Sequence, residues 1–299
     1  MRVRHFAAAA AFTLIVAGCG GSDAGNQAEE ESSAAPTVAE DVSFPEGSTM
    51  ALINEAGEIN VGTKYDQPGF GLLNPTTNTP EGFDVEIANL VAAALGIPED
   101  GINFSETVSA NRESFIQNGT VDIVVATYTI NDTRKELVSF AGPYYVAGQD
   151  IMVAAGNPEG ITGPEDLAGQ TVCSVEGSTP AENIRTNFPE VNLVTTDVYS
   201  KCADQLKNGE VVAVTTDNVI LTGFVATDPE SFELVGNPFT EEPYGIGLAL
   251  DDDEFRDFIN DVLEEAYESG AWADAYAATV GEITGTETPE PPPVDRYTS

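Results

Sequence analysis

Apolar runs of strand length alternate with amphipathic stretches along most of the chain. Residues 59–63, 102–108 and 121–126 are short apolar segments that predict buried strands. Between the first two, apolar residues from 83 to 95 recur at spacings of three and four, and Gly96 and Pro98 follow. That spacing predicts one helix with a buried face and a defined end. Alternating strands and helices are typical of an α/β fold.

A second series of the same kind begins near residue 164. It predicts strands at 171–175, 192–195 and 211–215, and helices at 180–188, 199–208 and 217–226. The chain then returns through 244–250 to a long amphipathic helix, whose buried face would hold Phe255, Phe258, Ile259, Val262, Leu263 and Ala266.

These two series predict an α/β protein of two lobes, the second inserted into the first. We expect lobe 1 to comprise residues 48–146 and 240–283, and lobe 2 residues 147–239. Two strands would cross between them. A cleft between lobes joined in this way can close on a small ligand by hinge motion.

The first 18 residues have the pattern of an export signal. Arg2 and Arg4 precede an apolar segment at 7–17, which is too short to span a bilayer as a permanent helix. The sequence Val-Ala-Gly-Cys at 16–19 resembles the lipobox of bacterial lipoproteins, in which cleavage before the cysteine is coupled to lipidation of its sulfur. An ordinary secretory signal is the alternative.

Both ends of the remaining chain predict disorder. Residues 19–47 are rich in Gly, Ser, Ala and Glu without an apolar period, and residues 284–299 contain four prolines. The first segment would be a flexible tether behind the lipidated Cys19. We therefore expect a protein on the outer face of the cell membrane, held by its lipid alone.

Composition excludes several classes of function. The chain carries 50 acidic residues against 11 basic ones, and two of those basic residues leave with the signal. Such a charge makes nucleic acid and anionic lipid poor partners. The only histidine, His5, also leaves, so histidine-based catalysis and histidine metal sites are excluded from the mature chain. We expect no cofactor and no metal, and the acidic run 251–254 predicts helix caps rather than a calcium loop.

Two cysteines remain in the exported chain. Cys173 and Cys202 predict one disulfide, because an even pair in an oxidising compartment is usually joined. The alternative, a catalytic thiol, would have no histidine partner.

Residues 127–134 form the most informative stretch, Thr-Tyr-Thr-Ile-Asn-Asp-Thr-Arg. It follows a predicted buried strand and supplies hydroxyl groups, backbone N–H groups and Arg134 at a predicted helix start. Such a set can hold a small carboxylate. The alternative is structural: the polar residues cap a helix, and Arg134 pairs with one of many acidic side chains.

Several motifs in order carry a family resemblance. They are Gly-Phe-Asp-Val-Glu-Ile-Ala at 82–88, Gly-Thr-Val-Asp at 119–122, Thr-Ile-Asn-Asp-Thr-Arg-Lys-Glu at 129–136, Phe-Ala-Gly-Pro-Tyr-Tyr at 140–145, Gly-Ser-Thr at 177–179 and Tyr-Gly-Ile-Gly at 244–247. Over residues 48–282 the chain resembles the solute-binding proteins of ABC importers for polar amino acids, family 3, and among them the glutamate-binding lipoproteins. The resemblance implies a monomer that delivers an amino acid to a permease.

The resemblance also implies roles for individual residues. Arg134 and Thr129 would hold the α-carboxylate of the ligand, while Thr127 and Asp217 would hold its α-ammonium group. The residues that would surround the ligand side chain are Lys64, Ser109, Arg112, Ser178, Thr179 and Tyr199. For Asp217, Ser178 and Thr179 the alternative is a plain helix cap, and for Lys64 a solvated loop lysine.

Cations in the predicted pocket favour glutamate or aspartate. A strongly acidic protein repels an anion, so an acidic ligand needs a locally positive site, and Lys64 and Arg112 would supply it. Tyr199 stands where some acidic-ligand binders carry histidine, which leaves glutamine and asparagine open.

Two other functions remain as alternatives. An amino-acid sensor subunit for a membrane signalling partner would use the same lobe closure. An enzyme on this fold, such as a secreted dehydratase, would need an unpaired acid facing the ligand, for which Asp217 and Glu176 are the nominees. We expect a binding protein and no enzyme.

Overall fold

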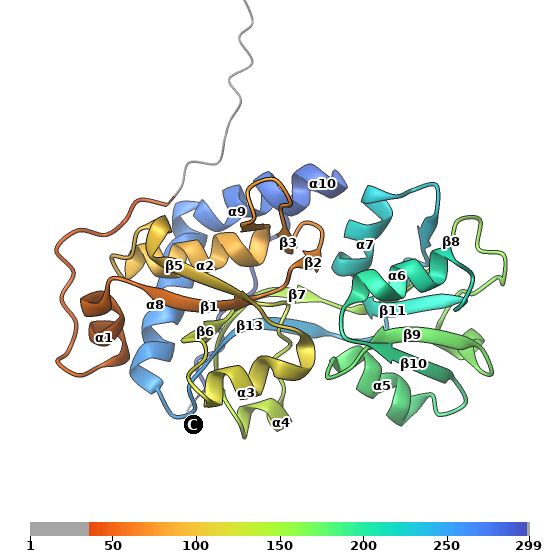
Figure 1. Ribbon diagram of the computed structural model, residues 1–299, viewed down its shortest axis with the longest axis horizontal. Helices are drawn as coiled ribbons and strands as arrows, with labels where there is room; N and C mark the ends of the chain where they lie inside the picture. The colour runs from red at the N-terminus through yellow and green to blue at the C-terminus, as the bar shows by residue number, and fades with distance from the viewer. Residues whose placement is uncertain (1–35, 298–299) are drawn as a thin grey trace, which may run out of the picture. The chain divides into compact units, whose positions relative to one another are not determined.

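A computed structural model describes residues 36–297 and contains two five-stranded sheets, each forming one lobe (Figure 1). The sheet of lobe 1 has the order β5-β1-β6-β13-β7. Its strands are β1 (Ile59–Thr63), β5 (Ile102–Glu106), β6 (Ile123–Val124), β7 (Ser139–Ala147) and β13 (Glu242–Leu248). β1 pairs in parallel with β5 and β6, whereas β13 is antiparallel to β6 and β7.

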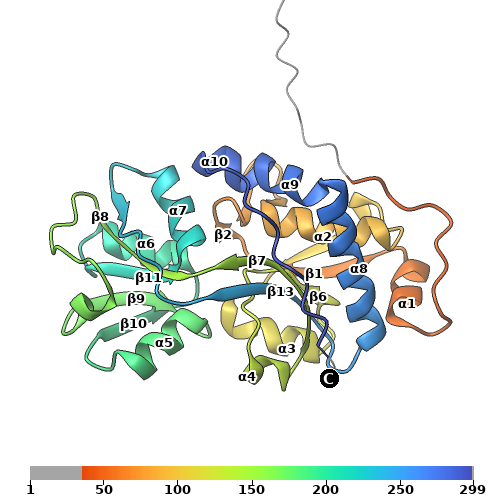
Figure 2. The ribbon, with the colours of Figure 1, turned by 180° about the vertical axis from the view of Figure 1, so that it is seen from behind.

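The sheet of lobe 2 has the order β10-β9-β11-β8-β12 (Figure 2). Its strands are β8 (Gln149–Ala154), β9 (Thr171–Val175), β10 (Asn192–Thr196), β11 (Ala213–Asp217) and β12 (Phe232–Leu234). β9 runs parallel to β10 and β11, and β8 is antiparallel to β11.

Two segments pass between the lobes, as the sequence predicts for an inserted lobe. β7 ends at Ala147 and β8 begins at Gln149, so one residue separates the two sheets on the way out. On the return, the Phe239 N–H donates to the Gln149 carbonyl, and Glu242 pairs with Ala147 in the lobe 1 sheet. Both crossings therefore run side by side.

Helices cover both faces of each sheet, which gives an α/β sandwich in each lobe. In lobe 1, α2 and α9 lie on one side and α3 and α4 on the other (Figure 1). The lobe 1 helices are α1 (Thr49–Ala56), α2 (Phe83–Ala94), α3 (Arg112–Gln117), α4 (Asp132–Lys135), α8 (Asp253–Ser269), α9 (Ala271–Tyr276) and α10 (Glu282–Thr284). In lobe 2, α6 (Tyr199–Lys207) and α7 (Asn218–Thr227) face α5 (Thr179–Asn187) across the sheet.

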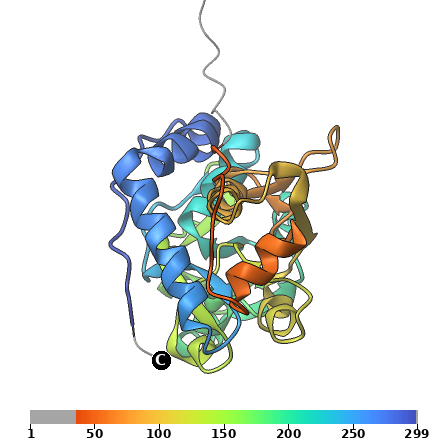
Figure 3. The ribbon, with the colours of Figure 1, turned by 90° about the vertical axis from the view of Figure 1, so that its left-hand side faces the viewer.

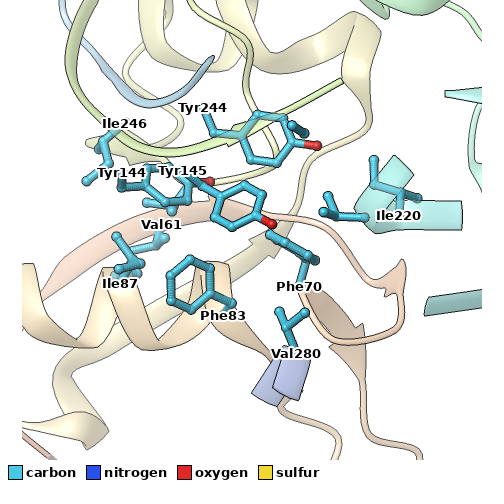
Figure 4. Packing of buried hydrophobic residues seen from close by; sticks show 14 of the residues in the cluster. Val61, Phe70, Phe83, Ile87, Tyr144, Tyr145, Ile220, Tyr244, Ile246 and Val280 are labelled. Carbon is cyan, nitrogen blue, oxygen red and sulfur yellow. The ribbon is translucent and has the colours of Figure 1, made fainter. Parts of the chain in front are cut away.

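An aromatic cluster fills the core of lobe 1 close to the crossing strands (Figure 4). Phe70 lies edge-on to Phe83, Tyr145 and Tyr244, with ring centroids 5.7 to 6.0 Å apart. Trp272 of α9 extends the cluster, and its indole N–H donates to the Tyr144 carbonyl. Edge-to-face aromatic pairs stabilise a core beyond the burial of apolar area alone. This cluster therefore stabilises the part of lobe 1 from which the crossing strands leave.

Two predicted elements are shorter than the sequence indicates. The apolar run 121–126 contributes only Ile123–Val124 to the sheet, although all six residues but Asp122 are buried. The helix start expected in 127–134 opens only the four-residue α4, which Asn131 caps and which ends at Glu136 before β7. This helix is too short for its dipole to create an anion site at its N-terminus.

The prediction of disorder is wrong in part for both segments. Residues 36–47 of the predicted tether pack on lobe 1: the Ala39 N–H donates to the Ala93 carbonyl, and Phe44 lies edge-on to Phe258 at 5.5 Å. Apolar residues in an otherwise polar segment supplied this contact. Cys19 and the signal segment lie outside the described residues.

The predicted tail 284–299 also packs on lobe 1 as far as residue 297, running beside α8 (Figure 3). The Asp295 N–H donates to the Gly142 carbonyl, and the Phe140 N–H donates to the Tyr297 hydroxyl at 2.8 Å. Arg296 pairs with Asp261 and Glu264 of α8. The tail thus covers the outer edge of β7, an edge strand of the lobe 1 sheet. The proline content of the tail had predicted disorder and gave no sign of this contact.

A disulfide joins Cys173 of β9 to Cys202 of α6, with their Cα atoms 5.5 Å apart. Both residues belong to lobe 2. Across residues 36–297 we find no helix that combines the length and the hydropathy needed to cross a bilayer.

Candidate functional site

A small cavity lies where the strand ends of the two lobes meet. Its lining combines the lobe 1 residues Ser109, Arg112, Thr127 and Thr129 with the lobe 2 residues Ser178, Thr179, Pro180, Tyr199, Asp217 and Ile220. The cavity volume is about 10 Å³. That is the space of one water molecule, so the two lobes are closed on each other.

Arg134 does not line this cavity itself, but it contacts the lining residue Thr129 on the lobe 1 side. Asn131 caps α4 by accepting from the Arg134 N–H, and the Thr129 carbonyl accepts from Arg134 Nη1 at 2.6 Å. Nε lies 3.3 Å from Glu113 Oε1. Nη2 donates across the cleft to the Gly177 carbonyl at 3.0 Å. The outer edge of the guanidinium thus faces lobe 2, where a planar carboxylate could replace the carbonyl.

Arg112 lies beside Arg134 and is also buried. Its Nη1 donates to the carbonyls of Ala126 and Thr127, and its Nη2 reaches the Gly177 carbonyl at 3.4 Å. Both guanidinium groups lie over the ring of Tyr128, 4.3 and 5.0 Å from its centroid. The ring and the carbonyls together stabilise two adjacent cations.

Gly177 makes the close approach between the lobes possible. Its φ is +78°, and a Cβ built there would lie 2.7 Å from Ala110 Cα in lobe 1. A side chain would therefore be strained and would also hold the lobes apart.

Thr127 is fixed by a buried network beneath the cavity. Its N–H donates to Asp84 Oδ2 at 2.8 Å, its hydroxyl donates to Gln67 at 3.0 Å, and its φ is +43°. Tyr144 donates its hydroxyl to the other oxygen of Asp84 at 2.6 Å. Burial raises the pKa of Asp84 to about 7, against the lowering effect of these two hydrogen bonds. Such over-determination is what keeps an unfavourable backbone conformation in place.

Asp217 is the last residue of β11 and faces the cavity from lobe 2. Its side chain makes no cap hydrogen bond to α7 among the described residues, so the plain helix cap considered from the sequence is not what the structure contains. Instead, Oδ2 accepts from the Tyr244 hydroxyl at 2.6 Å. Its buried Oδ1 makes no hydrogen bond within residues 36–297. Burial, followed by the charge of Glu242, raises the pKa of Asp217 to about 7.

Lys64 lies next to the cavity rather than in solvent. Its side chain is buried, and its Nζ donates to Ser109 Oγ at 2.8 Å. Desolvation, followed by the charge of Arg112, lowers the pKa of Lys64 to about 7. Two cations and a hydroxyl therefore converge on one end of the site.

The remaining predicted residues have mixed roles. Ser178 caps α5, because its Oγ accepts from the Ala181 N–H, and it also donates to the Val175 carbonyl. Thr179 donates to Glu242 Oε2 at 2.7 Å and lies 3.2 Å from the Thr129 hydroxyl across the cleft. Tyr199 begins α6, and its buried hydroxyl has a raised pKa, chiefly through desolvation.

Sequence reasoning missed several residues that hold the site. Glu113, Glu242, Gln67, Asp84 and Tyr244 each contact a predicted site residue. Asp84 and Tyr244 stand inside motifs that the sequence already singled out. Their role could not be inferred there, since it depends on contacts between segments far apart in the chain.

Comparison with known proteins gives a consistent set of relatives. Residues 59–282 match the model of bacterial extracellular solute-binding proteins, family 3. The chain is 43% identical over 256 residues to the glutamate-binding protein GluB of Corynebacterium glutamicum, covering 82% of this chain and 85% of that protein. It is 34% identical over 270 residues to the ABC transporter glutamine-binding protein GlnH of Bacillus subtilis, covering 90% and 93%.

A solved structure agrees with these relatives. The solute receptor for L-cysteine of Neisseria gonorrhoeae superimposes with a TM-score of 0.75 at 30% identity, covering 80% of this chain and 96% of that one. Family membership implies an amino-acid ligand, a permease partner and a place outside the cytoplasm. The two-lobe fold, the cleft between its strand ends and the match over residues 59–282 show that the chain belongs to the bacterial extracellular solute-binding proteins, family 3.

Proposed function

We propose that this protein captures an acidic amino acid, with glutamate as the principal ligand and aspartate as the second, and delivers it to the permease of an ABC importer. The name of the 43% identical Corynebacterium relative, a glutamate-binding protein, supports the ligand class. The convergence of Lys64, Arg112 and Ser109 on one end of the site is the observation that carries it.

The α-carboxylate would bind to Arg134 and Thr129. It would replace the Gly177 carbonyl as the acceptor for Arg134 Nη2. Arg134 would thereby exchange a neutral acceptor for a charged one. The α-ammonium would lie between the Thr127 hydroxyl and Asp217, whose Oδ1 is buried and unpaired among the described residues. Lobe closure would then form both contacts together.

The distal carboxylate would lie against Lys64 and Arg112, with Ser109, Thr179 and Tyr199 near it. A buried ammonium with a lowered pKa gains most from an anionic neighbour, because the anion restores the charged form that burial disfavours. An amide gives no such gain. The arrangement therefore supports glutamate over glutamine, although the 34% identical Bacillus relative is named for glutamine.

Isothermal titration of the purified protein with glutamate, aspartate, glutamine and asparagine tests this assignment. We expect glutamate to bind tightest. Lys64→Met should weaken glutamate by roughly 10- to 100-fold, the worth of a hydrogen bond to a charged group, and change glutamine less than threefold. Lys201→Met is the matched control, because that lysine pairs with Asp197 on the exposed face of α6.

Equal binding of amides and acids, unchanged by Lys64→Met, would contradict the acidic ligand and favour glutamine or asparagine.

Transport and sensing differ in the partner that receives the liganded protein. Deletion of a permease gene beside this one in the genome should abolish uptake of labelled glutamate, whereas a sensor subunit would leave uptake intact and silence a signalling response.

A further inference from the structure

The contact between Tyr244 and Asp217 is one of the shortest that join the two lobes. Tyr244 belongs to β13 of lobe 1, Asp217 ends β11 of lobe 2, and the hydroxyl donates to Oδ2 at 2.6 Å. Both side chains are almost fully buried. The bond joins the two lobes, and it engages one oxygen of the carboxylate while the other stays unpaired among the described residues.

Tyr244 is held rigidly on the lobe 1 side. Its ring packs against Phe70, Tyr144 and Tyr145, and its hydroxyl points toward the side where Ile220 of α7 lies (Figure 4). A β-bridge links Tyr244 to Thr129, and the Gly245 N–H donates to the Tyr128 carbonyl. The segment assigned to the α-carboxylate therefore fixes the backbone of the residue that reaches the ammonium side.

We propose that Tyr244 is a positioning residue for ligand binding: its hydroxyl orients the Asp217 carboxylate, so that Oδ1 is presented to the α-ammonium group of the ligand. The proposal rests on the proposed function, in which Asp217 is the counter-charge of the ammonium. It adds a residue that does not itself need to touch the ligand.

The charged surroundings show why this hydroxyl matters. The groups that act on Asp217 come from four elements: Glu242 and Tyr244 on β13, Arg112 on α3, Arg134 on α4 and Tyr199 on α6. Burial and Glu242 favour the protonated acid, whereas the Tyr244 hydrogen bond and the two arginines favour the carboxylate. Removing the hydroxyl leaves a buried carboxylate without its bond, and its pKa rises further.

The test is Tyr244→Phe, which keeps the ring and removes only the hydroxyl. We expect the dissociation constants of glutamate and glutamine to rise together by roughly 10- to 100-fold, because both share the ammonium group. The acid limb of the affinity–pH profile should also move to higher pH. Tyr145→Phe is the matched control, since this ring lies in the same cluster at 5.9 Å from Tyr244 and does not contact Asp217.

A double-mutant cycle with Asp217→Asn separates positioning from packing. If Tyr244 acts through the carboxylate, Tyr244→Phe has little further effect in the Asp217→Asn background. An equal loss in both backgrounds, or an unmoved acid limb, overturns the proposal and leaves Tyr244 as a packing residue. If Asp217→Asn leaves every affinity unchanged, the assigned ammonium site fails as well. Carbon NMR titration of the Asp217 carboxyl group without ligand should give a higher pKa in Tyr244→Phe; an unchanged pKa overturns the proposal without reference to any ligand.

Discussion

Lys64 is a buried lysine whose charge depends on what lies beside it. Desolvation and Arg112 lower its pKa from 10.5 to about 7, so the ammonium form is already being lost at neutral pH. Between pH 7 and 10.5 the unfolded chain binds more protons at this residue than the folded one. Lys64 therefore destabilises the fold at low pH, and this cost disappears as the pH rises through that window.

The same shift predicts a pH-dependent preference for acidic ligands. Glutamate would restore the charge on Lys64 and take up a proton above pH 7, so its affinity should fall with rising pH, by up to about tenfold per unit. Glutamine shares the α-groups but not the distal charge. We expect the ratio of glutamine to glutamate dissociation constants to fall between pH 7 and 9, as measured by titration calorimetry in two buffers. A flat ratio in the wild type, or the same slope in Lys64→Met, would refute this coupling.

Among the elements, the segment from Lys64 to Phe70 makes contacts in both directions. Lys64 and Gln67 turn toward lobe 1 site residues, whereas Asp66 of β2 (Asp66–Gln67) crosses to lobe 2 and accepts from the Ser200 N–H at 3.1 Å. Asp66 thus caps α6 from the opposite lobe. Its pKa is raised, first by desolvation.

Loss of this cap should weaken closure without changing specificity. Asp66→Ala is expected to raise the dissociation constants of glutamate and glutamine by the same factor, roughly 2- to 30-fold, the range of a helix cap. Asp197→Ala, which removes an exposed carboxylate near the same helix start, is the control. A selective loss of glutamate in Asp66→Ala would mean that the residue acts on the ligand side chain and not on closure.

The C-terminal segment contributes stability to lobe 1. The ring of Tyr297 lies 4.2 Å from Lys135 Nζ and 4.6 Å from the guanidinium carbon of Arg256, and its hydroxyl accepts from the Phe140 N–H. Tyr297→Ala should lower the free energy of unfolding by about 1–3 kcal/mol in urea titrations, with ligand affinity nearly unchanged. The exposed Glu290→Ala is the control. No loss of stability would mean that the tail is only loosely held in solution.

At the scale of the molecule, the alternation of apolar segments was enough to predict two α/β lobes with two crossings. The final amphipathic helix, now α8, was predicted from Phe255 to Ala266 and lies within Asp253–Ser269. The sequence failed where tertiary contacts override composition. The proline-rich tail is held on lobe 1 by Tyr297 and Arg296, and α4 ends after one turn as the chain leads into β7.

Prediction of the site shows the same division. Motifs and strand ends identified eight residues that line the cavity, and Lys64 beside it. They did not identify the partners that orient them, because Asp84 meets Thr127 across 43 residues and Tyr244 meets Asp217 across 27. Local pattern carries no information about such pairs.

Attachment to the membrane remains a proposal that concerns the chain before residue 36. If Cys19 carries the lipid, Cys19→Ser should move the protein from the detergent-rich phase to the aqueous phase in detergent partitioning, and Ser22→Ala should not. Partition of wild-type protein into the aqueous phase would refute the lipid anchor and indicate an ordinary secretory signal.

The disulfide between Cys173 and Cys202 lies wholly within lobe 2. It links β9, which leads to Ser178, to α6, which begins with Tyr199. Two segments that line the cavity are therefore joined covalently. Nothing covalent of this kind crosses to lobe 1 within residues 36–297. Oxidation outside the cytoplasm therefore fixes the cavity-lining part of lobe 2 before any solute binds. Opening and closing between the two lobes then depends on non-covalent contacts alone.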